Sequence, residues 1–195
     1  QAIKWTGTGN VAPVKLEYST NNGIAWTPIT ILASGALASL GNGAQSYAWN
    51  PVADVKTEQA KIRVSHNDTS HPDVVDESDN PFAIRPQLSV TTPAAGADLA
   101  VGTSGHTITI TRTSPTLTNV KLEYSINGGG FWNALPQVGA DNVTLTGTTT
   151  TFTWNNLPDA ISQNVLVRAV DLGNSAIIGT SPTFHIVGSI ALSAL

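Results

Sequence analysis

The sequence of 195 residues contains no cysteine and no methionine, so disulfide bonds are excluded and the redox compartment cannot be inferred. Only 11% of the residues are charged, and the nine Lys and Arg form no basic run, which argues against nucleic-acid binding. No apolar run reaches the roughly 18 residues that indicate a membrane span. Long stretches rich in Ala, Leu, Glu and Lys are also absent, so we expect little helix.

The most informative feature present is an internal repeat. The stretch VKLEYSTNNGIAW, from Val14 to Trp26, returns as VKLEYSINGGGFW from Val120 to Trp132. Further pairs follow in the same order, namely YAWN and FTWN, IRV and VRA, and FAI and FHI. The period is about 100 residues, which is the size of a whole domain and well above that of a solenoid unit.

Each copy of the repeat reads as short strands separated by turns. Val14, Leu16 and Tyr18 alternate with polar residues, which predicts a strand with one face in the core. The stretches NNG and NGGG that follow supply residues that tolerate positive φ in a tight hairpin. The expected strands are residues 2–5, 14–19, 26–32, 45–50, 60–65 and 82–85 in the first copy, and 88–92, 106–112, 119–125, 131–135, 148–155, 164–170 and 183–187 in the second. Such strands predict antiparallel β-sandwiches.

We therefore expect an all-β chain with two tandem sandwich domains, residues 1–86 and 87–187. The first copy has no counterpart of the strand at 88–92, so its domain is expected to lack a first strand. Residues 188–195 resemble that strand and predict the start of a following module. The chain begins without an initiator methionine and reads as part of a longer array. The missing strand is then encoded upstream or supplied by another chain through strand addition.

The motifs IKWTGTGN, VKLEYSTNNGIAW, YAWNPV, AKIRVSHND and DESDNPFAI resemble those of immunoglobulin-like or fibronectin-type-III-like modules in bacterial cell-surface proteins. The second copy is a looser match, with TITIT in place of a Trp-bearing strand and no DESDN before FHI. The resemblance implies an extracellular location and a structural role, as in a surface layer (S-layer) or comparable assembly. Its partners would be neighbouring modules or copies of the same chain. The alternative is an adhesin or a carbohydrate-binding spacer of a larger exported protein.

No residue constellation in the sequence indicates an enzyme. A G-x-S-x-G motif is absent, and NGGG lacks the Lys-Ser/Thr of a phosphate loop. Glu17 and Glu123 occupy the same repeat position in different domains, so they cannot face each other as glycosidase carboxylates. We expect each to pair with a Lys or Arg on the exposed sheet face. The five tryptophans could form a sugar-binding platform, or they could pack in the cores.

The acidic stretch NDTSHPDVVDESDN offers the candidate metal ligands. Calcium prefers six to eight oxygen ligands, so Asp73, Asp76, Glu77 and Asp79 form a candidate calcium site. A solvated loop with local Asx turns is the alternative, since the spacing is not that of an EF-hand. His66 and His71 lie in the same stretch and could form a transition-metal pair. No other cofactor is indicated.

Two N-glycosylation sequons occur in the chain. They place candidate acceptor amides at Asn67 in NDT and at Asn142 in NVT. Sequons are frequent by chance, and threonine is also a good strand former, so both asparagines are candidates for a mass spectrum to test.

Overall fold

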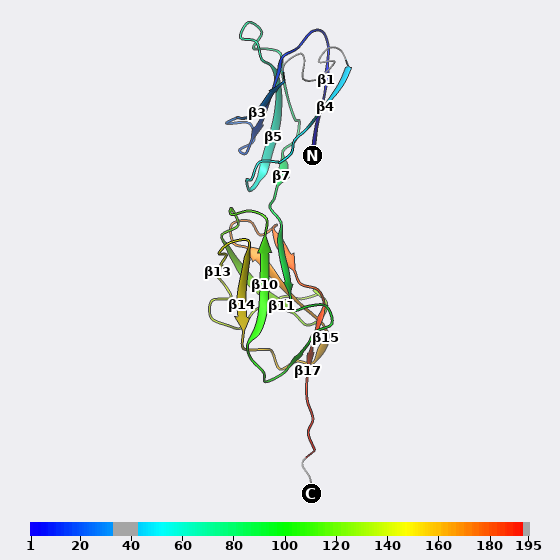
Figure 1. Ribbon diagram of the computed structural model, residues 1–195, viewed down its shortest axis with the longest axis vertical. Helices are drawn as coiled ribbons and strands as arrows, with labels where there is room; N and C mark the ends of the chain where they lie inside the picture. Colours follow the sequence, from blue (N-terminus) through cyan, green and yellow to red (C-terminus); the bar gives the residue numbers. More distant parts are fainter. Residues whose placement is uncertain (33–42, 193–195) are drawn as a thin grey trace. The chain divides into compact units, whose positions relative to one another are not determined.

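The computed structural model describes residues 1–32 and 43–192, and within these ranges the protein is all-β, with seventeen strands and no helix (Figure 1). Contacts divide the chain into two compact units, Gln1–Arg85 and Pro86–Leu195. No helix in the described ranges is long and apolar enough to cross a lipid bilayer. The prediction of an all-β chain is confirmed.

The first unit contains a small sheet and a larger one. Its strands are β1 (Ala2–Gly7), β2 (Val14–Ser19), β3 (Thr27–Leu32), β4 (Gly43–Ala48), β5 (Thr57–His66), β6 (Val75–Glu77) and β7 (Phe82–Ile84). β1 pairs with β4, and the larger sheet has the order β3-β2-β5-β6, with β7 also pairing β5. Every one of these pairs is antiparallel.

The core of the first unit follows from the alternation in its strands. Val14 and Leu16 on β2 are buried, and Lys15 between them lies on the other face. Trp49, which follows β4, is only 6% exposed and closes the same core. Among the described residues of this unit, the buried hydrophobic residues of the core are Ile3, Val14, Leu16, Trp49, Ala60 and Ile84. The cluster draws on both sheets, so the unit is sandwich-like.

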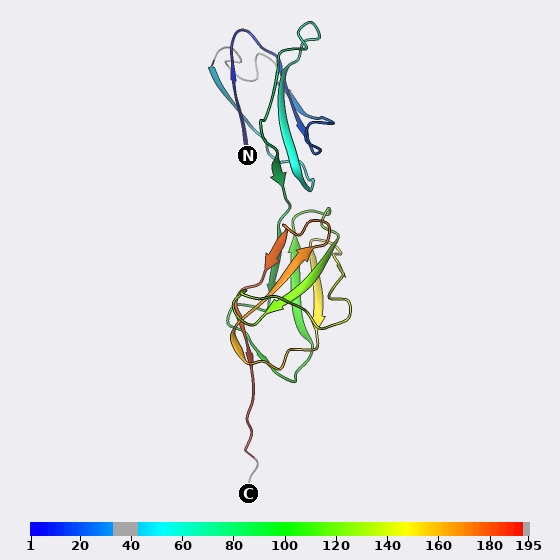
Figure 2. The ribbon, with the colours of Figure 1, turned by 180° about the vertical axis from the view of Figure 1, so that it is seen from behind.

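The second unit also has two sheets. Its strands are β8 (Leu88–Thr92), β9 (Asp98–Ala100), β10 (His106–Arg112), β11 (Asn119–Ser125), β12 (Asn133–Ala134), β13 (Val143–Thr144), β14 (Thr149–Trp154), β15 (Ser162–Asp171), β16 (Ile178–Thr180) and β17 (Phe184–Val187). One sheet has the order β14-β10-β8, and the other has the order β12-β11-β15-β17-β9, with β13 on β11 and β16 on β15. Figure 2 shows the strands of this unit from behind. The pairing of β17 with β9 is parallel.

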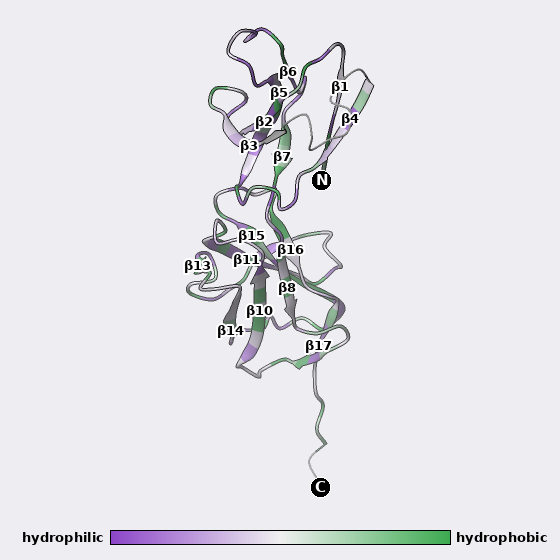
Figure 3. Ribbon diagram, turned by 45° about the horizontal axis from the view of Figure 1, so that its top comes forward, coloured by the Kyte–Doolittle hydropathy of each residue, from purple (hydrophilic) through white to green (hydrophobic). Residues whose placement is uncertain are grey.

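Apolar residues from both sheets of the second unit share one core. Ile108 and Ile110 of β10 are buried, and the threonines between and beside them alternate with them and are more exposed. The ribbon of β10 accordingly carries both hydrophobic and hydrophilic stretches (Figure 3). Val165 and Val167 of β15 join the same cluster from the other sheet, together with the fully buried Trp154. This period of two places one face of each strand inside and explains the sandwich-like packing.

The two units differ at one sheet edge. In the second unit, β10 lies between β14 and β8. In the first unit, β1 occupies the place of β10 and pairs only with β4, as far as the described residues extend. The last described residues, 188–192, form no strand, and the side chains of Ile190 and Leu192 are fully exposed to solvent. The assignment of residues 188–195 to a following module stays a prediction, and residues 193–195 lie outside the described ranges.

Candidate functional site

The repeated stretch VKLEYS folds into a strand that ends in a hydrogen-bonded hairpin. The Ser19 Oγ accepts hydrogen bonds from the backbone N–H of Asn21 at 3.2 Å and of Gly23 at 2.9 Å. The same hydroxyl donates to the Asn21 side-chain oxygen at 2.9 Å, and that oxygen accepts from the Ala25 N–H at 2.9 Å. Two side chains therefore accept hydrogen bonds from three backbone N–H groups of the turn, those of Asn21, Gly23 and Ala25.

The second unit repeats this hairpin atom for atom. Ser125 Oγ accepts from Gly129 N–H at 2.9 Å and donates to Asn127 Oδ1 at 2.8 Å. Asn127 Oδ1 then accepts from the Phe131 N–H at 2.9 Å. Gly129 has φ +93°, a backbone conformation that favours glycine, while a Cβ there would make only ordinary contact with the Trp132 ring at 3.5 Å. The shared pattern is S-x-N-x-G-x-x-W.

A charged cluster lies beside each hairpin, and we call it the Arg–Trp stack. In the first unit it comprises Lys15, Glu17, Trp26 and Arg63. Arg63 lies directly opposite Glu17 in the β2–β5 pairing and donates through Nε and Nη2 to Glu17 Oε2 at 2.9 and 2.7 Å. The Arg63 guanidinium lies 4.4 Å above the Trp26 ring, and Lys15 Nζ lies 2.9 Å from Glu17 Oε1.

The second Arg–Trp stack comprises Lys121, Glu123, Trp132 and Arg168. Arg168 Nε donates to Glu123 Oε2 at 2.6 Å, and its guanidinium lies 4.2 Å above the Trp132 ring. Lys121 Nζ lies 2.7 Å from Glu123 Oε1. The predicted pairing of both glutamates with Lys or Arg is confirmed. The prediction of an exposed face was wrong for Glu17, which is only 4% exposed because these neighbours cover it.

Both glutamates in the stacks are held in the ionised form. Burial by itself raises the pKa of Glu17, but hydrogen bonds and charge from Lys15 and Arg63 outweigh it and leave the pKa below the usual 4.5. For Glu123 burial likewise raises the pKa, while Lys121 and Arg168 lower it further than burial raises it. The sequence did not single out the two arginines, although the register of IRV against VKLEYS places them opposite the glutamates.

Acid should therefore weaken both units. Because the folded pKa is lowered, each glutamate stabilises the folded state fully above its unfolded pKa and loses this contribution as pH falls through the folded pKa. We expect Glu17→Gln with Glu123→Gln to cost about 1 kcal/mol per site at neutral pH. The free energy of unfolding should then fall less steeply with acid than in the wild type.

Urea denaturation followed by circular dichroism across a pH series measures this difference. Glu58→Gln serves as the control, because it removes the ion pair with Arg85, whose side chains are both more than 40% exposed. Parallel pH profiles for the wild type and the double variant would contradict the assignment.

The five tryptophans pack in the cores or against arginine side chains. Trp154 is fully buried and Trp49 nearly so, and each lies against a tyrosine, Tyr124 at 5.9 Å and Tyr18 at 5.4 Å between ring centroids. Trp5 packs against the core of the first unit. One face of each of the remaining two rings, Trp26 and Trp132, is covered by arginine in the stacks. The core and edge packing predicted for these residues agrees with their positions.

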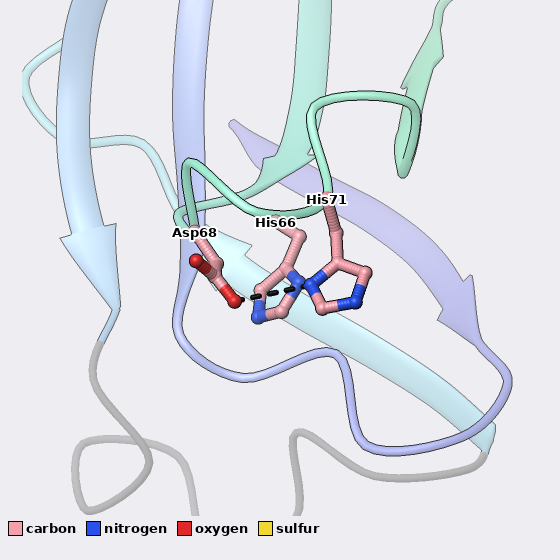
Figure 4. Close-up of side chains that lie close together, drawn as sticks. All are labelled: His66, Asp68 and His71. Carbon is pink, nitrogen blue, oxygen red and sulfur yellow. Dashed lines mark hydrogen bonds and ion pairs between the residues drawn. The ribbon is translucent and has the colours of Figure 1, made fainter.

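The loop between β5 and β6, residues 67–74, brings together the one group of metal-ligand side chains found in the described part of the chain. His66, Asp68 and His71 each place a ligand atom within 4.8 Å of the others (Figure 4). The His66 and His71 rings stack with centroids 5.9 Å apart. Asp68 Oδ2 lies 3.1 Å from His71 Nδ1. The sequence indicated the two histidines, and Asp68 was missed because it was counted only as one acid of many.

The four acids predicted to bind calcium do not form such a group among the described residues. Val75 to Glu77 form strand β6, where the sequence predicted only loop. Glu77 lies 4.0 Å from Lys61 across the neighbouring strand. Asp73, Asp76 and Asp79 are exposed. The calcium site stays a prediction to which the geometry adds no support.

Both predicted glycosylation sites are accessible. The Asn67 side chain is exposed at the start of the β5–β6 loop, and Asn142 is exposed just before β13. The Asn142 side-chain oxygen accepts a hydrogen bond from Asn119 at 2.8 Å. Glycan attachment at either residue stays a prediction.

Comparison of the chain with models of protein families and with curated proteins found no match.

Proposed function

We propose that the chain is a structural segment of a cell-surface protein built of tandem immunoglobulin-like modules, and that it contributes to a surface assembly of the S-layer kind. In this proposal the modules have no catalytic role. They set the length of the protein and present strand edges and loops for contact with neighbours, which are other modules or copies of the same chain.

The observation that carries the proposal is that the same structural residues occur at matching positions in both units. The hairpin and the Arg–Trp stack occur in both units with the same hydrogen bonds and nearly the same distances. The residues that the repeat preserves most closely are therefore occupied in holding turns and strands together. Repetition of such a structural unit is typical of spacers and arrays, in which copy number sets reach.

The edge of β1 supports a role in lateral or end-to-end contact. Its counterpart β10 pairs with β8 through residues Leu88 to Thr92, which leaves no such edge free there. Within the described residues β1 pairs on one side only, so its second row of N–H and C=O groups is available for strand addition. A β8-like strand from elsewhere in the assembly would complete the small sheet.

Antibodies raised against the purified chain test the proposal on cells of the producing organism. We expect intact cells to bind the antibody as strongly as permeabilised cells do, and electron microscopy of the label to follow the whole cell outline. Label that requires permeabilisation would contradict a surface location.

A glycan-binding assay separates the main proposal from the adhesin or carbohydrate-binding alternative. We expect no retention on immobilised polysaccharides, because arginine covers Trp26 and Trp132 and the cores hold Trp49 and Trp154. Retention that is lost in Trp26→Ala or Trp132→Ala would favour the alternative.

A further inference from the structure

The β5–β6 loop of the first unit is closed by backbone hydrogen bonds that fix its shape. The His66 N–H donates to the Val74 carbonyl at 2.8 Å, which joins the two ends of the loop. The Asn67 N–H donates to the Pro13 carbonyl at 2.7 Å. Asp68 Oδ1 accepts from the Ser70 N–H at 2.9 Å, an Asx turn that directs the chain back toward His66. Two histidines five residues apart thus come to face one another.

The ring of His66 has a defined tautomer. Its Nε2 lies 3.2 Å from the Ala12 carbonyl oxygen, and a carbonyl can only accept, so Nε2 carries the hydrogen. The Nδ1 lone pair of the neutral ring is then free to bind a cation. A hydrogen bond from the outer ring nitrogen to a backbone carbonyl is the arrangement that orients histidine ligands in protein metal sites.

Asp68 supplies the negative charge beside the two rings. Asp68 Oδ1 accepts from the Ser70 N–H at 2.9 Å, and Oδ2 lies 3.1 Å from His71 Nδ1. These two hydrogen bonds hold the carboxylate beside the imidazole rings. The acid and both rings reach solvent, with side-chain exposures of 39% for Asp68 and 61% for His71, so an ion has open access.

We propose that His66, Asp68 and His71 form a binding site for a divalent transition-metal ion of the zinc class. Two imidazole nitrogens and one carboxylate oxygen are the ligand set that zinc and similar borderline ions prefer, with water completing the coordination shell. Ligand atoms about 2.1 Å from a tetrahedral zinc ion lie about 3.4 Å from each other. The three ligand atoms already lie within 4.8 Å of one another, so binding requires the side chains to approach by about 1 Å or less at each atom.

The same features argue against calcium at this position. Calcium takes oxygen ligands almost exclusively, and two of these three groups offer nitrogen. The site also belongs to the first unit alone. The corresponding loop after β15, residues 172–177, contains no His, Asp or Glu, so the proposed ion does not depend on the repeated architecture or on the proposed surface role.

Isothermal titration calorimetry of the untagged full chain with zinc chloride, after chelator treatment and dialysis, tests the proposal. We expect one zinc ion per chain. His66→Ala and His71→Ala should each weaken binding at least about tenfold, and the double variant should abolish it. Asp68→Asn should weaken binding as well, and cobalt(II) should give an absorption spectrum of a low-coordinate site.

The second unit supplies a matched control. His185 Nδ1 lies 2.8 Å from Asp98 Oδ1, a histidine–aspartate pair that no third ligand joins in the described part of the chain. His185→Ala should leave zinc affinity unchanged. Circular dichroism checks that each variant folds. Absence of zinc binding, or full binding by the His66/His71 double variant, would overturn the proposal, and displacement of zinc by calcium would overturn the choice of metal.

Discussion

Trp154→Ala is expected to cost the second unit about 3–5 kcal/mol, the largest loss from any single substitution that we predict. The ring is 0% exposed and lies in the cluster formed by both sheets. Its Nε1 donates to the Asn156 carbonyl at 2.9 Å, so the indole also satisfies a polar backbone group after β14 ends. Alanine would leave a large cavity and remove the contact with Tyr124.

Amide hydrogen exchange measured by mass spectrometry can report the loss of stability separately for each unit. We expect faster exchange in peptides of β10, β14 and β15, and little change in peptides of the first unit. Trp132→Ala is the control, because that ring is partly exposed and its contact with Arg168 contributes about 1 kcal/mol. Equal losses for Trp154→Ala and Trp132→Ala would contradict the role assigned to the buried ring.

Long strands with clear alternation were predictable from the sequence. The bounds of β2, β8, β10 and β11 match the expected strands, since apolar residues at every second position mark a half-buried face. The hairpins were predictable for a similar reason, because Asn22 and Gly23 adopt the positive φ that the turn requires. These features depend on local chemistry that the sequence displays directly.

Short strands were not predictable in the same way. The strands β6, β9, β13 and β16 contain two or three residues each, too few to display a period. These strands form because folding brings a partner strand beside them, as it does for β9, which pairs in parallel with β17. The sequence predicted a loop at each of these positions, and in the structure each segment pairs with a longer strand.

The candidate site residues were likewise only partly predictable from the sequence. The sequence identified His66 and His71 because two histidines in one loop are uncommon, but it could not identify Asp68, whose role depends on an Asx turn. It favoured the later acids Asp73, Asp76, Glu77 and Asp79, of which Asp76 and Glu77 lie on β6, and it left Asp68 out. The sequence shows which residues are of a type that can bind a metal ion. Which of these side chains come close together depends on the path of the backbone, which only the structure shows.

Gly179 provides the sharpest case of a requirement that only the structure reveals. It lies in β16 opposite Ala169, and a Cβ at this position would lie 2.6 Å from the backbone atoms of Leu88 and Ser89. Those atoms begin β8, and Leu88 is itself buried in the core, so they cannot move aside freely. We expect Gly179→Ala to destabilise the second unit by about 3 kcal/mol, the upper end of typical overpacking costs.

The first unit offers a matched position for comparison. Asp76 lies opposite Val64 in β6, as Gly179 lies opposite Ala169, and its side chain is exposed. A side chain is tolerated there because no described strand occupies the place that β8 takes in the second unit. Asp76→Ala should therefore change stability by less than about 0.5 kcal/mol in the isolated chain. Urea denaturation of both variants measures the contrast, and a Gly179→Ala variant as stable as wild type would refute the close approach.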